Sequence, residues 1–228
     1  MRSIICVLAL LPISCGFAPG AASIAADAPP RAVDARAVDA APDAPPDAPP
    51  DAPAPRITLS ETVSDTDVPG HTTQCPGSAG GTTGSAGYFR VFHLEDFGIS
   101  TGFSTLTVAF SVDIASSATG VTALVGLYGG AGGSASLDPT QMTWLGSAAM
   151  NVPDDSTPQA VEIPVAVAIP AGASLIVEVA SPNYDSGYFV LGGTTSAQSA
   201  PGYFSCDFDE PMNHDAAYLI EVTGTTTP

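Results

Sequence analysis

Residues 103–114, with the sequence FSTLTVAFSVDI, constrain the fold more strongly than any other stretch of this chain. Apolar side chains there alternate with small or polar ones: Leu106, Val108, Phe110, Val112 and Ile114 alternate with Thr105, Thr107, Ala109, Ser111 and Asp113. A period of two sends successive side chains to opposite faces of a β-sheet. We therefore expect a strand whose apolar set faces a core and whose other set faces outward.

Further segments of the same kind follow to the C-terminus, without a convincing helical segment among them. Strands are predicted at residues 57–63, 88–94, 103–114, 121–128, 142–150, 159–169, 173–180, 187–191, 202–206 and 217–223. The segments between them, such as SSATG, GGAGGSASLDP, VPDDSTP and SPNYDSG, are rich in residues that form turns. Many short strands separated by turns predict an all-β fold, an antiparallel β-sandwich of the jelly-roll type.

Several of these strands have an alternating apolar face that can be named. The expected inner faces are Val121, Ala123, Val125 and Leu127; Val161, Ile163, Val165 and Val167; Leu175, Val177 and Val179; and Tyr218, Ile220 and Val222. In outline, residues 85–224, with YFRVFHLEDFGI near the start and GYFSCDF near the end, resemble β-sandwich modules found beside or after secreted bacterial enzymes. This resemblance implies the fold and carries no functional residue.

The N-terminus has the features of an export signal. Arg2 precedes the apolar run IICVLALL, which is too short to span a bilayer as a helix. The run ends in LPISCG and resembles bacterial lipoprotein signals, which implies cleavage after Ser14 and lipidation of Cys15. The sequence departs from that pattern at Pro12, where the family usually has Leu. Ordinary secretion, with cleavage near GFAPGAASIAA, is the alternative.

A linker predicted at residues 15–55 separates the signal, residues 1–14, from a β-sandwich domain at residues 56–228. From residue 26 the linker is low-complexity Ala, Pro and Asp, which favours a disordered, extended chain of about 3.1 Å per residue. A lipidated Cys followed by such a spacer resembles surface lipoproteins of Gram-negative bacteria. This resemblance implies an outer-membrane location, since Gly16 is not the Asp of an inner-membrane retention signal. A tail without mechanical use is the alternative.

The charge balance excludes some classes of partner. The chain has 23 acidic residues against 5 basic ones and no Lys, for a net charge of −18. Such a chain repels phosphate backbones and anionic lipid, which argues against nucleic-acid binding and electrostatic membrane docking. Cations, neutral glycans and surface proteins remain as partners, and a membrane is reached through the lipid anchor only.

The four cysteines divide into two pairs. Cys6 and Cys15 lie in the signal region, so Cys75 and Cys206 are left in the exported domain, where oxidation is permitted. We expect a disulfide between them. A free thiol or a metal site is the alternative, although no His or third Cys lies close in sequence to either.

Acidic residues provide the best candidate for a bound ion. Asp207, Asp209 and Glu210 in CDFDEP could place hard oxygen ligands around calcium, with Asp215 nearby. A solvated acidic turn is the alternative. Four aromatic residues are candidates for stacking on sugar rings, or else for ordinary packing: Trp144, Tyr184, Tyr188 and Tyr203.

Catalytic motifs are scarce. Residues 98–102, GISTG, match the pattern of a nucleophile elbow at Ser100, but that motif needs a helix after the turn and a strand is expected here. His71, His93 and His214 lack the spacing of metal ligands. The sequence therefore predicts a non-catalytic surface module for binding or adhesion, tethered to the cell envelope. A structural envelope lipoprotein and a secreted hydrolase are the alternatives.

Overall fold

The computed structural model describes residues 54–63, 66–71, 73–75, 84–155, 157–182, 187–207, 209–214 and 217–227. The chain divides into two units, Met1–Pro50 and Asp51–Pro228, and all described residues belong to the second. The predicted signal peptide, Cys15 and most of the predicted linker therefore lie outside the described residues, as do Tyr184 and Asp215. Within the described ranges no helix is long and apolar enough to cross a membrane.

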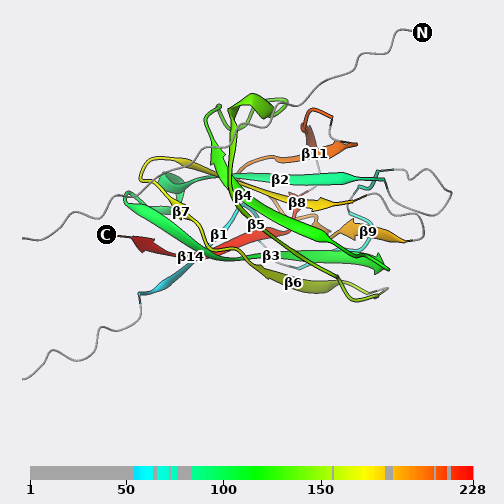
Figure 1. The fold of residues 1–228 in the computed structure, drawn as a ribbon. Helices are drawn as coiled ribbons and strands as arrows, with labels where there is room; N and C mark the ends of the chain where they lie inside the picture. Colours follow the sequence, from blue (N-terminus) through cyan, green and yellow to red (C-terminus); the bar gives the residue numbers. More distant parts are fainter. Residues whose placement is uncertain are drawn as a thin grey trace, which may run out of the picture. The chain divides into compact units, whose positions relative to one another are not determined.

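Two antiparallel sheets make up the described unit (Figure 1). The β3 sheet has the order β1 (Arg56–Ser60), β14 (Ile220–Thr227), β3 (Gly102–Ser116) and β6 (Gln159–Pro164), with β7 (Ala168–Ile169) and β9 (Tyr188–Leu191) also paired to β3. The β8 sheet has the order β12 (Met212–His214), β11 (Gly202–Cys206), β2 (Ala86–His93), β8 (Ser174–Ser181), β4 (Val121–Tyr128) and β5 (Met142–Met150).

Short elements complete the unit: a ladder of β10 (Gly193–Thr194) with β13 (Ala217–Tyr218), and the 3₁₀ helices η1 (Leu94–Phe97) and η2 (Pro139–Gln141). The chain changes sheet at most connections, as in jelly-roll sandwiches. The predicted all-β sandwich is confirmed. The predicted bounds of residues 121–128, 142–150 and 202–206 agree with β4, β5 and β11.

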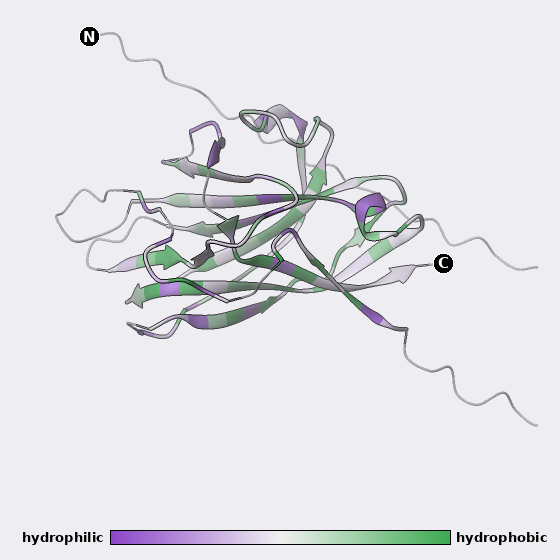
Figure 2. Cartoon of the chain, turned by 180° about the vertical axis from the view of Figure 1, so that it is seen from behind, coloured by the Kyte–Doolittle hydropathy of each residue, from purple (hydrophilic) through white to green (hydrophobic). Residues whose placement is uncertain are grey.

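The main core lies between the two sheets, and hydrophobic residues alternate with more polar ones along the strands (Figure 2). Val177 and Val179 of β8 and Tyr88 of β2 face Val108 and Phe110 of β3 across this core. All residues of the predicted inner faces are buried in the main core except Leu127 and Val167. These two are half-buried and pack against the core. Burying such side chains contributes roughly 25 cal/mol per Å² of apolar surface, which is the main force that holds the sheets together.

Strand β3 contains the predicted strand at residues 103–114; it is the longest strand and pairs with four others. Its alternation between inner and outer faces is interrupted twice. The register with β14 slips opposite Leu106, and the register with β9 slips at Asp113. Such bulges turn the following side chains to the other face of the sheet. The predicted core positions of Leu106 and Ile114 are therefore wrong, since both are half-buried, whereas Thr105 and Asp113, expected outside, are buried.

The predicted strand at residues 159–169 is also wrong as one element, because it is divided into β6 and β7. Between them the Thr105 side chain takes the place of a ladder bond: its hydroxyl donates to the carbonyl of Val165 at 2.5 Å and accepts from the amide of Val167 at 3.0 Å. The backbone amide of Thr105 donates to the carbonyl of Val167 at 2.9 Å. Pro164, which lacks an amide donor, ends β6 at this point.

A second apolar cluster covers part of the outer face of the β8 sheet. Leu137, from the connection between β4 and β5, packs there on Phe89, Val91, Ile176 and Tyr203. The segment GGAGGSASLDP is therefore more than a turn. Its fold over the sheet fixes the position of η2, which borders the site described next.

Candidate functional site

An open pocket of about 560 Å³ lies at the end of the β8 sheet where β4 ends and β5 and β8 begin. Its lining comes from three segments: Leu127, Tyr128, Gly129 and Gly130; Thr140, Gln141 and Thr143; and Gly172, Ala173 and Ser174. A neighbouring pocket of about 290 Å³ shares the last three residues and adds His93, Leu94, Glu95 and Asp96. We call the two together the loop-end pocket.

Strand register sets the floor of the loop-end pocket. His93, Ser174 and Tyr128 lie side by side on β2, β8 and β4, as direct partners in antiparallel pairs. His93 Nδ1 and Ser174 Oγ are 2.7 Å apart, so these two side chains form a hydrogen bond across the strands. The Tyr128 hydroxyl accepts from the backbone amide of Asp138 at 3.3 Å, which holds the start of η2 against β4.

The rim of the pocket is held by the cap of η2. Asp138 Oδ1 accepts from the amide of Thr140 at 2.8 Å and from its hydroxyl at 2.7 Å. The hydrogen bond from the Thr140 side chain, followed by that from its amide, lowers the pKa of Asp138. The carbonyl of Gln141 accepts from Gly129 at 2.9 Å, which closes the loop. Gln141 and Thr140 are thereby held at the pocket with exposed side chains.

The 2.7 Å contact of Ser174 with His93 lies within the reach of a nucleophile and its base, but the surroundings of His93 differ from those of a catalytic pair. A Cβ placed on Gly132 would lie 2.2 Å from His93 Nε2, so the loop backbone occupies the far side of the ring. Among the residues that the structure describes, no carboxylate forms an ion pair with His93 to orient it, as a catalytic triad requires. We assign His93 to holding β2, β8 and the β4–β5 loop together.

One side of the loop-end pocket carries acidic residues, and the other side is lined by uncharged residues. Glu95 and Asp96 of η1 are exposed at the smaller part, whereas neutral hydroxyl and amide groups line the larger part. Neither lining includes Lys or Arg. The pocket therefore offers hydrogen-bond donors and acceptors for a polar ligand without a cation that would attract an anionic one.

The three carboxylates predicted to bind calcium have different partners. Asp207 accepts from the Ser85 hydroxyl at 2.8 Å, and Glu210 accepts from that of Ser136. Asp209 makes a backbone hydrogen bond from its amide to the carbonyl of Cys206 at 2.9 Å. Within the described ranges no three His, Cys, Asp or Glu side chains converge as a metal site would need. Calcium binding at this turn stays a prediction.

The predicted aromatic residues are not brought together in the described part of the chain. Trp144 is 38% exposed on β5, and its ring lies over Gly126 of β4. Tyr188 belongs to the other sheet, and Tyr203 is buried with its hydroxyl bonded to the amide of Gly133 at 3.1 Å. A row of stacking rings is therefore not formed by these three.

Other predictions have clear outcomes. Cys75 and Cys206 form the expected disulfide, with Cα atoms 5.5 Å apart. Gly98, with a φ of 72°, ends η1, and β3 follows where a nucleophile elbow would need a helix, so Ser100 does not lie on such an elbow. His71 lies in a loop, His93 ends β2, and His214 ends β12 and stacks on Tyr218.

Two features escaped the sequence reasoning. Glu162 of β6 and Glu221 of β14 flank Ala109 of β3, and they border a shallow hollow of about 210 Å³ on the outer face of the β3 sheet. Glu178 of β8 lies between Phe89 and Leu124, its strand partners, and burial raises its pKa to about 7. Glu178 lies between the buried Val177 and Val179 in sequence. The alternation of the strand could have indicated that the Glu178 side chain points outward, but not that other residues cover it.

No family model matches the chain, and no curated protein is significantly similar to it. Among solved structures it is similar to one of Cwp84, a surface layer associated protein of Clostridium difficile, containing cysteine protease and lectin-like domains, with 15% identity and a TM-score of 0.44 over 64% of this chain. A structure of Cwp84 after propeptide cleavage is 13% identical, with a TM-score of 0.47 over 75% of this chain. This chain spans only 33% and 40% of the length of those chains. Both likenesses are too distant to assign a function.

Proposed function

We propose that the folded unit is a non-catalytic binding module for a neutral, hydroxyl-rich ligand such as a glycan. The observation that carries this proposal is the larger part of the loop-end pocket, with its neutral polar lining and its volume of about 560 Å³. Pockets for small ligands commonly have volumes of about 300 to 1,000 Å³ and a few polar groups that fix orientation. Thr140, Gln141, Thr143 and Ser174 supply such groups from two separate segments.

Display on the cell envelope belongs to the same proposal. It rests on the resemblance of LPISCG to lipoprotein signals and on the Pro-rich spacer after Cys15. The expected consequence is that Cys15→Ala releases the protein from membrane fractions into the soluble exported fraction. Membrane association of that variant equal to that of the unchanged protein would contradict lipidation at Cys15.

The ligand class is tested on an array of neutral, amino and acidic glycans, probed with the exported protein. We expect binding to neutral glycans and weak binding to acidic ones, because the chain carries a net charge of −18. Parallel arrays with calcium, and with NaCl of matched ionic strength, test whether the predicted ion at Asp207, Asp209 and Glu210 contributes. Absence of binding to every glycan class would contradict the proposal.

Substitutions in the loop-end pocket test whether the ligand binds there. Gln141→Ala and Thr143→Ala should each weaken binding by about two- to tenfold, the equivalent of one hydrogen bond. Gln74→Ala is the matched control, because Gln74 is exposed beside the disulfide at the other end of the β8 sheet. Equal affinity of all three variants for the glycan would show that the ligand binds outside the loop-end pocket.

A further inference from the structure

Strand β5 is the outermost strand of the β8 sheet, so one of its edges has no neighbouring strand among the described residues. Its other edge pairs with β4 over the whole strand, from Met142 opposite Tyr128 to Met150 opposite Val121. Besides this ladder, the amide of Met142 donates to the carbonyl of Pro139 in η2, and within the described ranges no other backbone hydrogen bond outside the ladder involves β5. The free edge of the 9-residue strand is about 30 Å long at the usual rise per residue.

This edge lacks the features by which proteins usually protect a free strand. Such strands carry charged residues or proline, which discourage another chain from pairing. The sequence of β5, MTWLGSAAM, contains neither, whereas the outer strand β6 of the other sheet carries Glu162 and ends in Pro164. Trp144 and Leu145 of β5 are 38% and 42% exposed, which is rare for large apolar residues in the described part of the chain.

The second half of β5 has the regular geometry that pairing needs. The register with β4 slips between Val125 and Gly126, so the irregularity is confined to Leu145. From Gly146 to Met150 the strand is regular, and the residues between them, Ser147, Ala148 and Ala149, have small side chains. Small side chains leave the outer amides and carbonyls accessible to another backbone.

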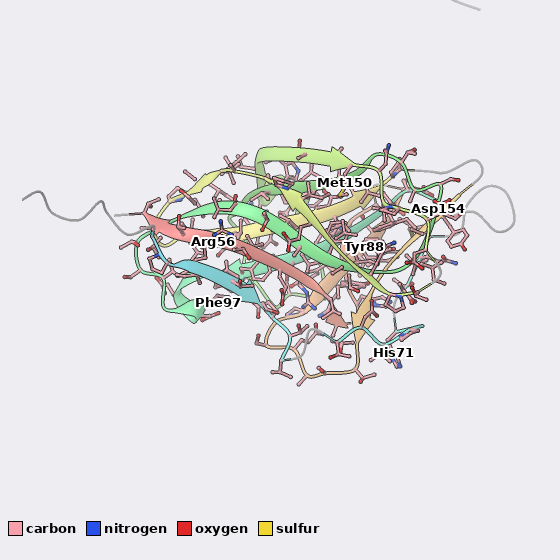
Figure 3. All side chains as sticks on the ribbon, turned by 90° about the horizontal axis from the view of Figure 1, so that it is seen from below. Arg56, His71, Tyr88, Phe97, Met150 and Asp154 are labelled. Carbon is pink, nitrogen blue, oxygen red and sulfur yellow. A yellow bond between two sulfur atoms is a disulfide. The ribbon has the colours of Figure 1, made fainter. Side chains whose placement is uncertain are left out.

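Carboxylates stand beyond both ends of this uncharged strand. Asp138 precedes β5 at the cap of η2 and is exposed. Asp154 follows β5 and is also exposed, with its carboxylate accepting from the amide of Ser117. Figure 3 labels Met150 and Asp154, which mark the C-terminal end of the strand and the carboxylate after it. An occupant of the edge would therefore meet negative charge at each of its ends.

We propose that the free edge of β5 binds an extended segment of a partner polypeptide, uncharged in its centre and basic at both ends. Backbone hydrogen bonds to the edge would supply affinity, as in other cases of strand addition. Basic ends would pair with Asp138 and Asp154. A second copy of this chain fits less well, because every copy carries a net charge of −18 and has no basic residue close to β5 in sequence.

The probe is a fluorescein-labelled peptide with two lysines at each end and alternating threonine and valine between them. Fluorescence anisotropy measures its affinity for the exported protein. We expect saturable binding, and loss of binding when alternate peptide nitrogens on one edge are methylated, since these can no longer donate to the strand. Binding of the methylated peptide with unchanged affinity, or no binding of either peptide, would overturn the proposal.

Variants of the protein test the edge and the charges separately. Ser147→Lys places a charge on the edge and should weaken binding by at least about tenfold, whereas Ala160→Lys, on outer strand β6, is the matched control. Asp138→Asn with Asp154→Asn keeps the side-chain acceptors and should weaken binding by about two- to tenfold at low salt. Equal affinity of Ser147→Lys and Ala160→Lys would reject β5 as the site. A dimer without peptide, dissociated by Ser147→Lys in sedimentation, would assign the edge to a second copy instead.

Discussion

Arg90 is a charged residue whose position the strand pattern did not indicate. It is fully buried in β2, where Nη1 donates to Gln198 Oε1 and to the carbonyl of Ala200, and Nη2 donates to the carbonyl of Tyr218, each at 2.8 Å. Burial lowers its pKa to about 10, so the guanidinium stays charged at neutral pH. Arg90 thereby ties β2 to β13 and to the segment before β11.

Glu178 makes stability depend on pH. Burial raises its pKa from 4.5 to about 7, so the folded state holds a proton that the unfolded state has released. The free energy of unfolding therefore falls as pH rises from about 4.5 through 7. We expect Glu178→Gln to remove this loss and to raise the free energy of unfolding by about 1 to 3 kcal/mol at pH 8, with little change at pH 4.

Urea unfolding at pH 4, 6 and 8 measures the effect of Glu178→Gln. The matched control is Glu162→Gln, because Glu162 is exposed on β6 and its removal relieves no burial. A difference between Glu178→Gln and the unchanged protein that stays constant from pH 4 to pH 8 would show that Glu178 titrates normally.

At the scale of elements, the Thr105 side chain of β3 replaces backbone pairing at the break between β6 and β7. Thr105 is 1% exposed, and its hydroxyl satisfies a carbonyl and an amide in the break between β6 and β7. Removing a buried hydroxyl leaves its partners unsatisfied, which costs about 1 to 3 kcal/mol. The Thr105 hydroxyl therefore stabilises the break between β6 and β7 at this edge of the β3 sheet.

Thr105→Val should lower the melting temperature by about 2 to 12 °C, given about 2 to 4 °C per kcal/mol for a domain of this size. Thr107→Val is the control, because Thr107 lies on the same strand, is half-buried, and shows no side-chain hydrogen bond in the described part of the chain. Differential scanning calorimetry compares the two. Equal melting temperatures would mean that the ladder relaxes to satisfy Val165 and Val167 without the hydroxyl.

For the whole molecule, the disulfide is the longest covalent constraint. Cys75 precedes β2 and Cys206 ends β11, with a sequence separation of 131. In the chain-entropy view, closing a loop of this length stabilises the fold by about 5 kcal/mol. The bond joins the start of the β8 sheet to a strand near the end of the chain.

Cys75→Ser with Cys206→Ser should lower the melting temperature by about 10 °C or more. Reducing agent should destabilise the unchanged protein to a similar extent and leave the double variant unaffected. Thiol counting on the protein unfolded in denaturant, before any reducing agent is added, provides the independent check. Two reactive thiols from Cys75 and Cys206 before reduction would contradict the bond.

The sequence by itself determined the fold class, most strand positions and the disulfide pairing. Alternation is a local property of period two, so β4, β5 and β11 could be placed from their own residues. The disulfide followed because residues 56–228 contain only Cys75 and Cys206 to pair.

Only the tertiary structure decided which side chains meet. Bulges reversed the expected faces of Leu106 and Ile114 because a register slip depends on the partner strand, which the residues of one strand do not specify. His93 and Ser174, separated by 81 positions, share a hydrogen bond, whereas Asp207 and Glu210, almost adjacent in sequence, bind different serines. Convergence in space depends on how strands pair and how loops cover them, so the loop-end pocket could not be predicted from motifs.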